Sequence, residues 1–68
     1  MDEEVLNKGI RRFLKQVGIT SQAEIESAVG RALRQRQFKG NEALKATVTL
    51  EIEGLGEIHR LQGVIPLE

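Results

Sequence analysis

The fold depends on residues 13–25, which have the sequence FLKQVGITSQAEI. Apolar residues at helical spacing precede this stretch, and a second apolar set at helical spacing follows it. Gly18 predicts the end of the first helix, because glycine enters the left-handed conformation of a helix end without steric cost. Ser21 and Glu24 have the spacing of a capping box, which predicts a new helix start. We therefore expect two helices joined by a tight corner.

The two predicted helices cover about residues 3–17 and about residues 22–38. Asp2 is the expected N-cap of the first helix, and Gly40 is the expected stop of the second. The apolar face of the first helix consists of Val5, Leu6, Gly9, Ile10, Phe13, Leu14 and Val17. The second helix has a narrower apolar stripe, made of Ile25, Ala28, Val29, Ala32 and Leu33.

After residue 42 the hydrophobic period changes from 3.6 to 2, which predicts two strands, about residues 45–53 and about residues 58–65. Gly54-Leu55-Gly56 is the expected turn between them. We expect a register in which facing residue numbers add to 111, because Glu51 then faces Arg60 across the pair.

These elements predict an α+β protein with the order ααββ, in which two amphipathic helices pack on a C-terminal antiparallel hairpin within a single domain, residues 1–68. A two-stranded sheet is marginal alone and has two exposed edges. We expect two hairpins to join in a homodimer with a four-stranded sheet, covering Ile58 and Val64 on the outer face. The alternative is a monomer whose strand edges are protected by charged residues.

Charge is unevenly distributed, although the net charge is zero. Residues 1–7 carry three acidic residues and no basic one, residues 8–45 carry nine basic against three acidic ones, and residues 46–68 carry one basic against four acidic ones. Four basic residues recur at i, i+3, i+4 and i+7 on the first helix. The candidate polyanion or partner face comprises Lys8, Arg11, Arg12 and Lys15, with Arg31 and Arg34 from the second helix.

Two helices with a glycine in the connecting turn also suggest a DNA-binding helix-turn-helix. Leu14 is too bulky for the close helix crossing of that motif, and Glu24 and Glu26 at the start of the second helix would repel phosphates. Nucleic-acid binding therefore stays the alternative function, based on the basic residues and without an aromatic platform for base stacking.

Catalytic, metal and membrane functions have little support in the sequence. The chain has one histidine, one aspartate and no cysteine, so we expect no enzyme, cofactor or metal site. Glu57 and His59 are two apart on a strand and should point the same way, as a metal-binding pair would, but we interpret them as a solvated turn glutamate and a histidine at the sheet end near Ile52. No apolar run approaches about 18 residues, and the N-terminus is acidic where a secretory signal would be basic, so we expect a cytoplasmic protein that does not enter membranes.

Three segments carry a resemblance to known sequences: residues 7–26, NKGIRRFLKQVGITSQAEIE, residues 39–46, KGNEALKA, and residues 50–56, LEIEGLG. The chain resembles a family of short, uncharacterised bacterial proteins of similar length, a domain of unknown function. The resemblance implies a complete small protein, and it transfers no activity or functional residue. We expect a non-enzymatic interaction or adaptor module, homodimeric and with an unidentified protein partner, and a weak nucleic-acid or polyanion binder as the alternative.

Overall fold

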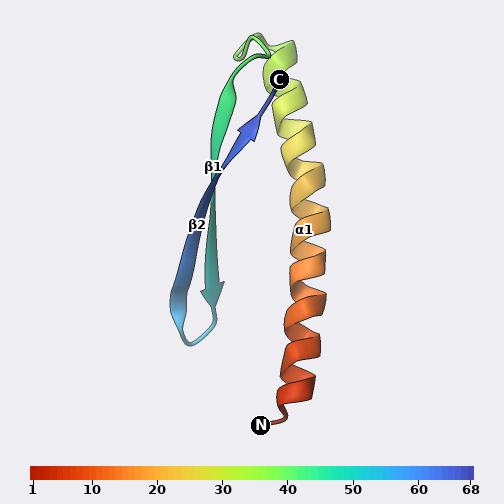
Figure 1. Cartoon of the computed structure of the whole chain (residues 1–68), viewed down its shortest axis with the longest axis vertical. Coiled ribbons are helices and arrows are strands. Elements are labelled where there is room, and N and C mark those ends of the chain that lie inside the picture. Colours follow the sequence, from red (N-terminus) through yellow and green to blue (C-terminus); the bar gives the residue numbers. More distant parts are fainter. The chain divides into compact units, whose positions relative to one another are not determined.

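A computed structural model describes all 68 residues and contains one helix followed by an antiparallel hairpin (Figure 1). The elements are α1 (Glu3–Arg34), β1 (Ala43–Ile52) and β2 (Gly56–Pro66). The chain divides into two compact units, Met1–Gln35 and Arg36–Glu68. The predicted α+β class is therefore confirmed. The helix is not apolar enough along its length to cross a membrane.

The prediction of two helices is wrong, because α1 continues through the expected corner as one helix of 32 residues (Figure 1). Gly18 keeps a helical conformation and has no positive φ. A glycine inside a helix costs only about 1 kcal/mol relative to alanine. Ending one helix and starting another leaves up to about four C=O and four N–H groups without helical partners. One continuous helix is therefore lower in free energy than two helices with a break at Gly18, and Ser21 does not act as an N-cap.

The two predicted apolar sets are in phase, which also favours one helix. Leu14 in the first set and Ile25 in the second are separated by eleven residues, which is about three helical turns. A single straight helix therefore places both sets on the same side, and no corner is needed to align them.

The ends of α1 agree with the prediction at the start and differ at the finish. Asp2 is the N-cap, and its Oδ1 accepts hydrogen bonds from the backbone N–H groups of Glu4 at 2.9 Å and Val5 at 3.2 Å. The helix ends at Arg34, with Gln35 as C-cap. Arg36 follows with a φ of 61°, so the left-handed position expected at Gly40 is occupied by an arginine.

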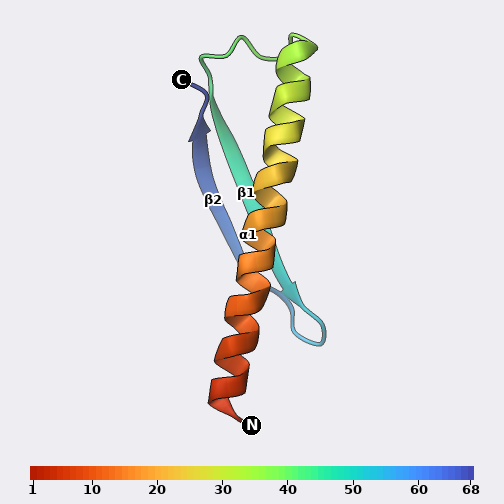
Figure 2. The ribbon, with the colours of Figure 1, turned by 90° about the vertical axis from the view of Figure 1, so that its right-hand side faces the viewer.

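The hairpin is confirmed (Figure 2), but its predicted register is wrong, as the pairing of the strand residues shows. Facing residue numbers add to 109 from Ala43↔Pro66 to Leu50↔His59 and to 108 at Ile52↔Gly56. A β-bulge between these two parts of the ladder leaves Ile58 as the extra residue of β2. The prediction failed because it assumed an uninterrupted ladder, whereas the turn uses Gly54 and Gly56 with φ of 87° and 72° and the bulge absorbs one residue.

The register gives the hairpin one apolar and one polar face, as the alternation in β1 predicted. The apolar face comprises Leu44, Ala46, Val48 and Leu50 with Ile65, Gly63, Leu61 and His59. The polar face comprises Lys45, Thr47, Thr49 and Glu51 with Val64, Gln62, Arg60 and Glu57. The sheet has two strands, so the expected four-stranded dimeric sheet finds no support in the structure.

Candidate interaction surface

An apolar stripe that contains one serine runs along most of α1. Its members recur every three or four residues in an eleven-residue repeat and fall within a sector of about 100° on the helix. We call this set the α1 stripe: Leu6, Ile10, Leu14, Val17, Ser21, Ile25, Ala28 and Ala32. The sequence predicted the apolar residues on either side of Gly18, but as parts of two helices. The eleven-residue repeat that joins them was missed, because a helix end was expected at Gly18.

The α1 stripe is largely exposed. Leu6 and Ile10 each expose 45% of their surface and Leu14 exposes 50%, whereas Ala32 is the one buried residue of the chain at 8%. Helices in water draw most of their stability from packing an apolar face against another surface. A contiguous apolar surface on a protein marks a site of interaction. The α1 stripe is therefore the strongest candidate for a binding surface.

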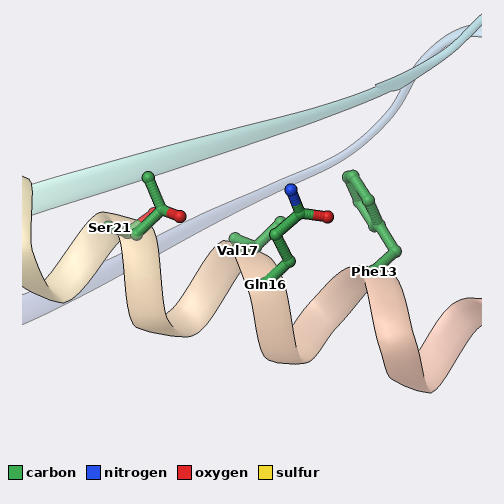
Figure 3. A pocket seen from close by; sticks show the side chains of 5 residues that line it. Phe13, Gln16, Val17 and Ser21 are labelled. Atoms are coloured by element: carbon green, nitrogen blue, oxygen red, sulfur yellow. The ribbon is translucent and has the colours of Figure 1, made fainter.

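A shallow hollow of about 300 Å³ lies beside the middle of the α1 stripe. Figure 3 shows side chains that project from the same side of the helix to line it. The lining residues are Phe13, Gln16, Val17, Thr20 and Ser21. Phe13 and Val17 supply apolar walls, and the other three supply an amide and two hydroxyl groups. This combination suits an inserted apolar side chain with a few polar contacts at its rim.

The six basic residues predicted to form one face lie in two separate places on α1. Lys8, Arg11, Arg12 and Lys15 share one side of the helix over two turns and are all exposed. Arg31 lies about 24 Å further along the axis from Lys15 and on a different side of the helix, and Arg34 belongs to the same last turn. We call the first group, Lys8, Arg11, Arg12 and Lys15, the basic face.

None of the basic-face side chains forms a salt bridge. The single salt bridge of the structure joins Arg60 Nη2 to Glu57 Oε1 at 3.2 Å, within β2. The charges of the basic face are therefore free to meet an anionic partner. Arg31 and Arg34 have a local role, since cations in the last turn of a helix complement its macrodipole.

Ile58 and Val64, the predicted dimer face, are both exposed but do not form a continuous patch. Val64 lies opposite Lys45 on the polar face of the hairpin. Ile58 is the extra residue at the bulge, and Arg60 and Gln62 occupy the positions of the polar face between the two. Their role in a dimer stays a prediction.

Glu42 organises the connection between α1 and β1, a role that sequence reasoning missed. Its carboxylate accepts hydrogen bonds from the backbone N–H groups of Lys39 at 2.8 Å, Gly40 at 2.8 Å and Asn41 at 3.1 Å. These donors, the N–H of Lys39 foremost and that of Gly40 next, hold the pKa of the Glu42 carboxyl below its ordinary value of 4.5. Its backbone oxygen accepts a further bond from Leu67 N at 2.9 Å.

No cluster of three or more acidic, histidine or cysteine side chains has the geometry to hold a metal ion. Glu57 and His59 lie on opposite faces of the hairpin because the bulge separates them.

One protein-family model matches the chain, and it covers residues 1–68. Its description is a family of unknown function (DUF6494). No curated protein and no solved structure matches the chain.

Proposed function

The chain belongs to this family of unknown function, and we propose that it is a non-enzymatic interaction module that assembles with a second copy of itself through the α1 stripe. The observation that carries the proposal is the exposure of this apolar surface along nearly all of a 32-residue helix. Covering one half-exposed leucine or isoleucine is worth roughly 1 kcal/mol. The stripe has four such side chains, Leu6, Ile10, Leu14 and Ile25, so covering it by a partner is favourable along much of its length.

A second copy is the partner that the chain's own chemistry favours. Acidic residues gather at the start of α1, in Asp2, Glu3 and Glu4, and basic residues gather in its last turn. A surface with opposite charges at its two ends is complementary to itself.

A pair of variants tests this function. Leu14→Glu places a charge in the α1 stripe, and Lys15→Glu changes the adjacent residue on the basic face. We expect sedimentation velocity to show a dimer for the wild type and for Lys15→Glu, and a monomer for Leu14→Glu, because a buried unpaired carboxylate is costly. A dimer that survives Leu14→Glu would contradict the proposal.

The same measurement on Val64→Glu separates the α1 stripe from the hairpin surface that the sequence favoured. If the protein assembles through the α1 stripe, the Val64→Glu variant should keep the mass of a dimer. A monomeric Val64→Glu variant with a dimeric Leu14→Glu variant would instead assign the interface to Ile58 and Val64.

Polyanion binding is the second candidate function, supported by the four exposed side chains of the basic face and their lack of salt bridges. Neutralising four phosphates of duplex DNA predicts a log–log salt slope of about −3.6, so the affinity should fall by about 10²-fold between 50 and 200 mM salt. Fluorescence anisotropy with a mixed DNA and RNA pool measures this.

A matched charge reversal provides the control for polyanion binding. Arg12→Glu should weaken binding more than Lys45→Glu, which reverses an equal charge on the hairpin. Equal losses in both variants, or no binding at low salt, would contradict a specific role for the basic face.

A further inference from the structure

We infer that α1 pairs in antiparallel orientation with α1 of a second copy, in a register where facing residue numbers add to 38 or 39. This inference rests on the proposed function and adds the orientation and register of the same surface. It follows from three properties of the α1 stripe, which are its spacing, its side-chain sizes and the charges at its ends.

The spacing of the α1 stripe is compatible with a two-fold axis near the middle of the helix. When the stripe is aligned with a second copy running in the opposite direction, each of its eight positions faces a position of the other copy. The two residue numbers then add to 38 or 39. The facing pairs are Leu6 with Ala32, Ile10 with Ala28, Leu14 with Ile25, and Val17 with Ser21. An isologous interface requires this kind of self-complementary arrangement.

Side-chain size distinguishes the antiparallel from the parallel orientation. The larger members, Leu6 and Ile10, lie near the start of the helix, and the smaller ones, Ala28 and Ala32, lie near its end. Antiparallel pairing sets Leu6 and Ile10 against alanines at both ends of the stripe, and its two larger residues nearest the middle, Leu14 and Ile25, face each other. Parallel pairing would set large against large at one end and leave alanines facing each other across a gap at the other.

Charge favours the same orientation. Glu3 and Glu4 occupy the first turn of α1, and Arg31 and Arg34 occupy the last. Antiparallel pairing brings the acidic end of one helix beside the basic end of the other and sets the two macrodipoles in opposition. Parallel pairing would bring acidic ends together and basic ends together.

The repeat length predicts the shape of the pair. Eleven residues per three turns is 3.67 residues per turn, close to the 3.6 of a straight helix. Two such helices, each about 48 Å long, stay in contact along the stripe with only slight right-handed supercoiling.

Disulfide trapping between full-length single-cysteine variants tests the orientation, because the chain has no cysteine of its own. Ile10→Cys is mixed with Ala28→Cys, both exposed positions of the stripe, then oxidised mildly and separated under non-reducing conditions. The matched control mixes Arg12→Cys with Glu26→Cys, whose numbers also add to 38 but which lie on the side of α1 away from the stripe.

We expect the mixture of Ile10→Cys and Ala28→Cys to form the mixed disulfide and the control mixture to remain unlinked. Each stripe variant alone should not cross-link, because its two copies lie about 27 Å apart in an antiparallel pair. Disulfides of Ile10→Cys with itself and of Ala28→Cys with itself would overturn the antiparallel orientation.

Sedimentation of the same variants under reducing conditions distinguishes failure of this inference from failure of the proposed function. A dimer without the mixed disulfide overturns the α1 register but leaves self-association standing. A monomer at every concentration overturns both, and then the α1 stripe is covered within the chain or by another protein.

Discussion

Arg36 has a φ of 61° and is the one residue other than glycine in the left-handed region. It directly follows the C-cap Gln35, where helices most often place a glycine. A side chain in this conformation costs roughly 1 kcal/mol relative to glycine. The end of α1 therefore carries a small, local strain.

Arg36→Gly should relieve this strain and raise the free energy of unfolding by about 0.5–1 kcal/mol in chemical denaturation. Arg36→Ala is the control, because it removes the same charge but keeps a side chain at positive φ. If the alanine variant gained as much stability as the glycine variant, loss of charge would explain the gain and the strain would have no part in it.

Glu42 makes the connection between α1 and β1 sensitive to acid. Its folded pKa lies below its ordinary value of 4.5, so the folded form binds fewer protons than the unfolded form and the contribution of Glu42 to stability is complete above that pH. The contribution is lost as the pH falls from 4.5 through the folded pKa. We expect the amide resonances of Lys39, Gly40 and Asn41 to titrate together in this acidic range.

Glu42→Gln should abolish that shared titration and speed hydrogen exchange at Lys39 and Gly40. Glu53→Gln is the matched control, since the Glu53 carboxylate takes part in none of the side-chain hydrogen bonds. Three amides that titrate unchanged in Glu42→Gln would show that another group controls them.

At the scale of elements, the continuity of α1 rests on residues 13–25. Gly18→Ala distinguishes one helix from two by the sign of its effect. A Cβ at this position meets nothing within 4 Å, and the backbone is helical. Alanine should therefore stabilise the protein by about 0.5–1 kcal/mol, because glycine is the poorer helix former.

A helix that ended at Gly18 would give the opposite result, because alanine would then be forced into a left-handed conformation. Thermal unfolding followed by circular dichroism measures the difference. A loss of stability in Gly18→Ala, at unchanged helical content, would instead indicate that the first helix ends at Gly18.

The sequence predicted most elements and missed how they connect. Asp2 as N-cap, the alternation of β1 and the turn at Gly54 follow from local chemistry, and local chemistry decides them. The prediction of a corner was wrong because the capping signals of Gly18 and Ser21 compete with continuous helical hydrogen bonding. Only the free energy of the whole helix determines whether one helix or two are formed. The predicted register was wrong because a β-bulge has a weaker sequence signature than a turn, so the extra residue was not expected.

The candidate interaction surface could also be predicted only in part, because local sequence patterns do not show how the elements connect. The basic face spans about two turns of one helix, so its periodicity predicted it, whereas Arg31 and Arg34 were assigned to the same face only on the assumption of a corner. The α1 stripe became visible as one surface once Leu14 and Ile25 proved to belong to the same helix.

At the scale of the whole molecule, we propose that the exposed apolar stripe of the 32-residue α1 pairs with the same stripe of a second copy. The strength of such pairing depends on concentration, since association costs translational and rotational freedom. In this proposal the charges at the ends of α1 act within one chain on the helix dipole and also between two chains, whereas the stripe is covered only when two chains meet.

Sedimentation equilibrium of the wild-type chain over a hundredfold range of concentration tests this claim most directly. Self-association through α1 should give a mass that rises with concentration to twice the 7.6 kDa of one chain. A mass that stays at 7.6 kDa throughout would contradict it.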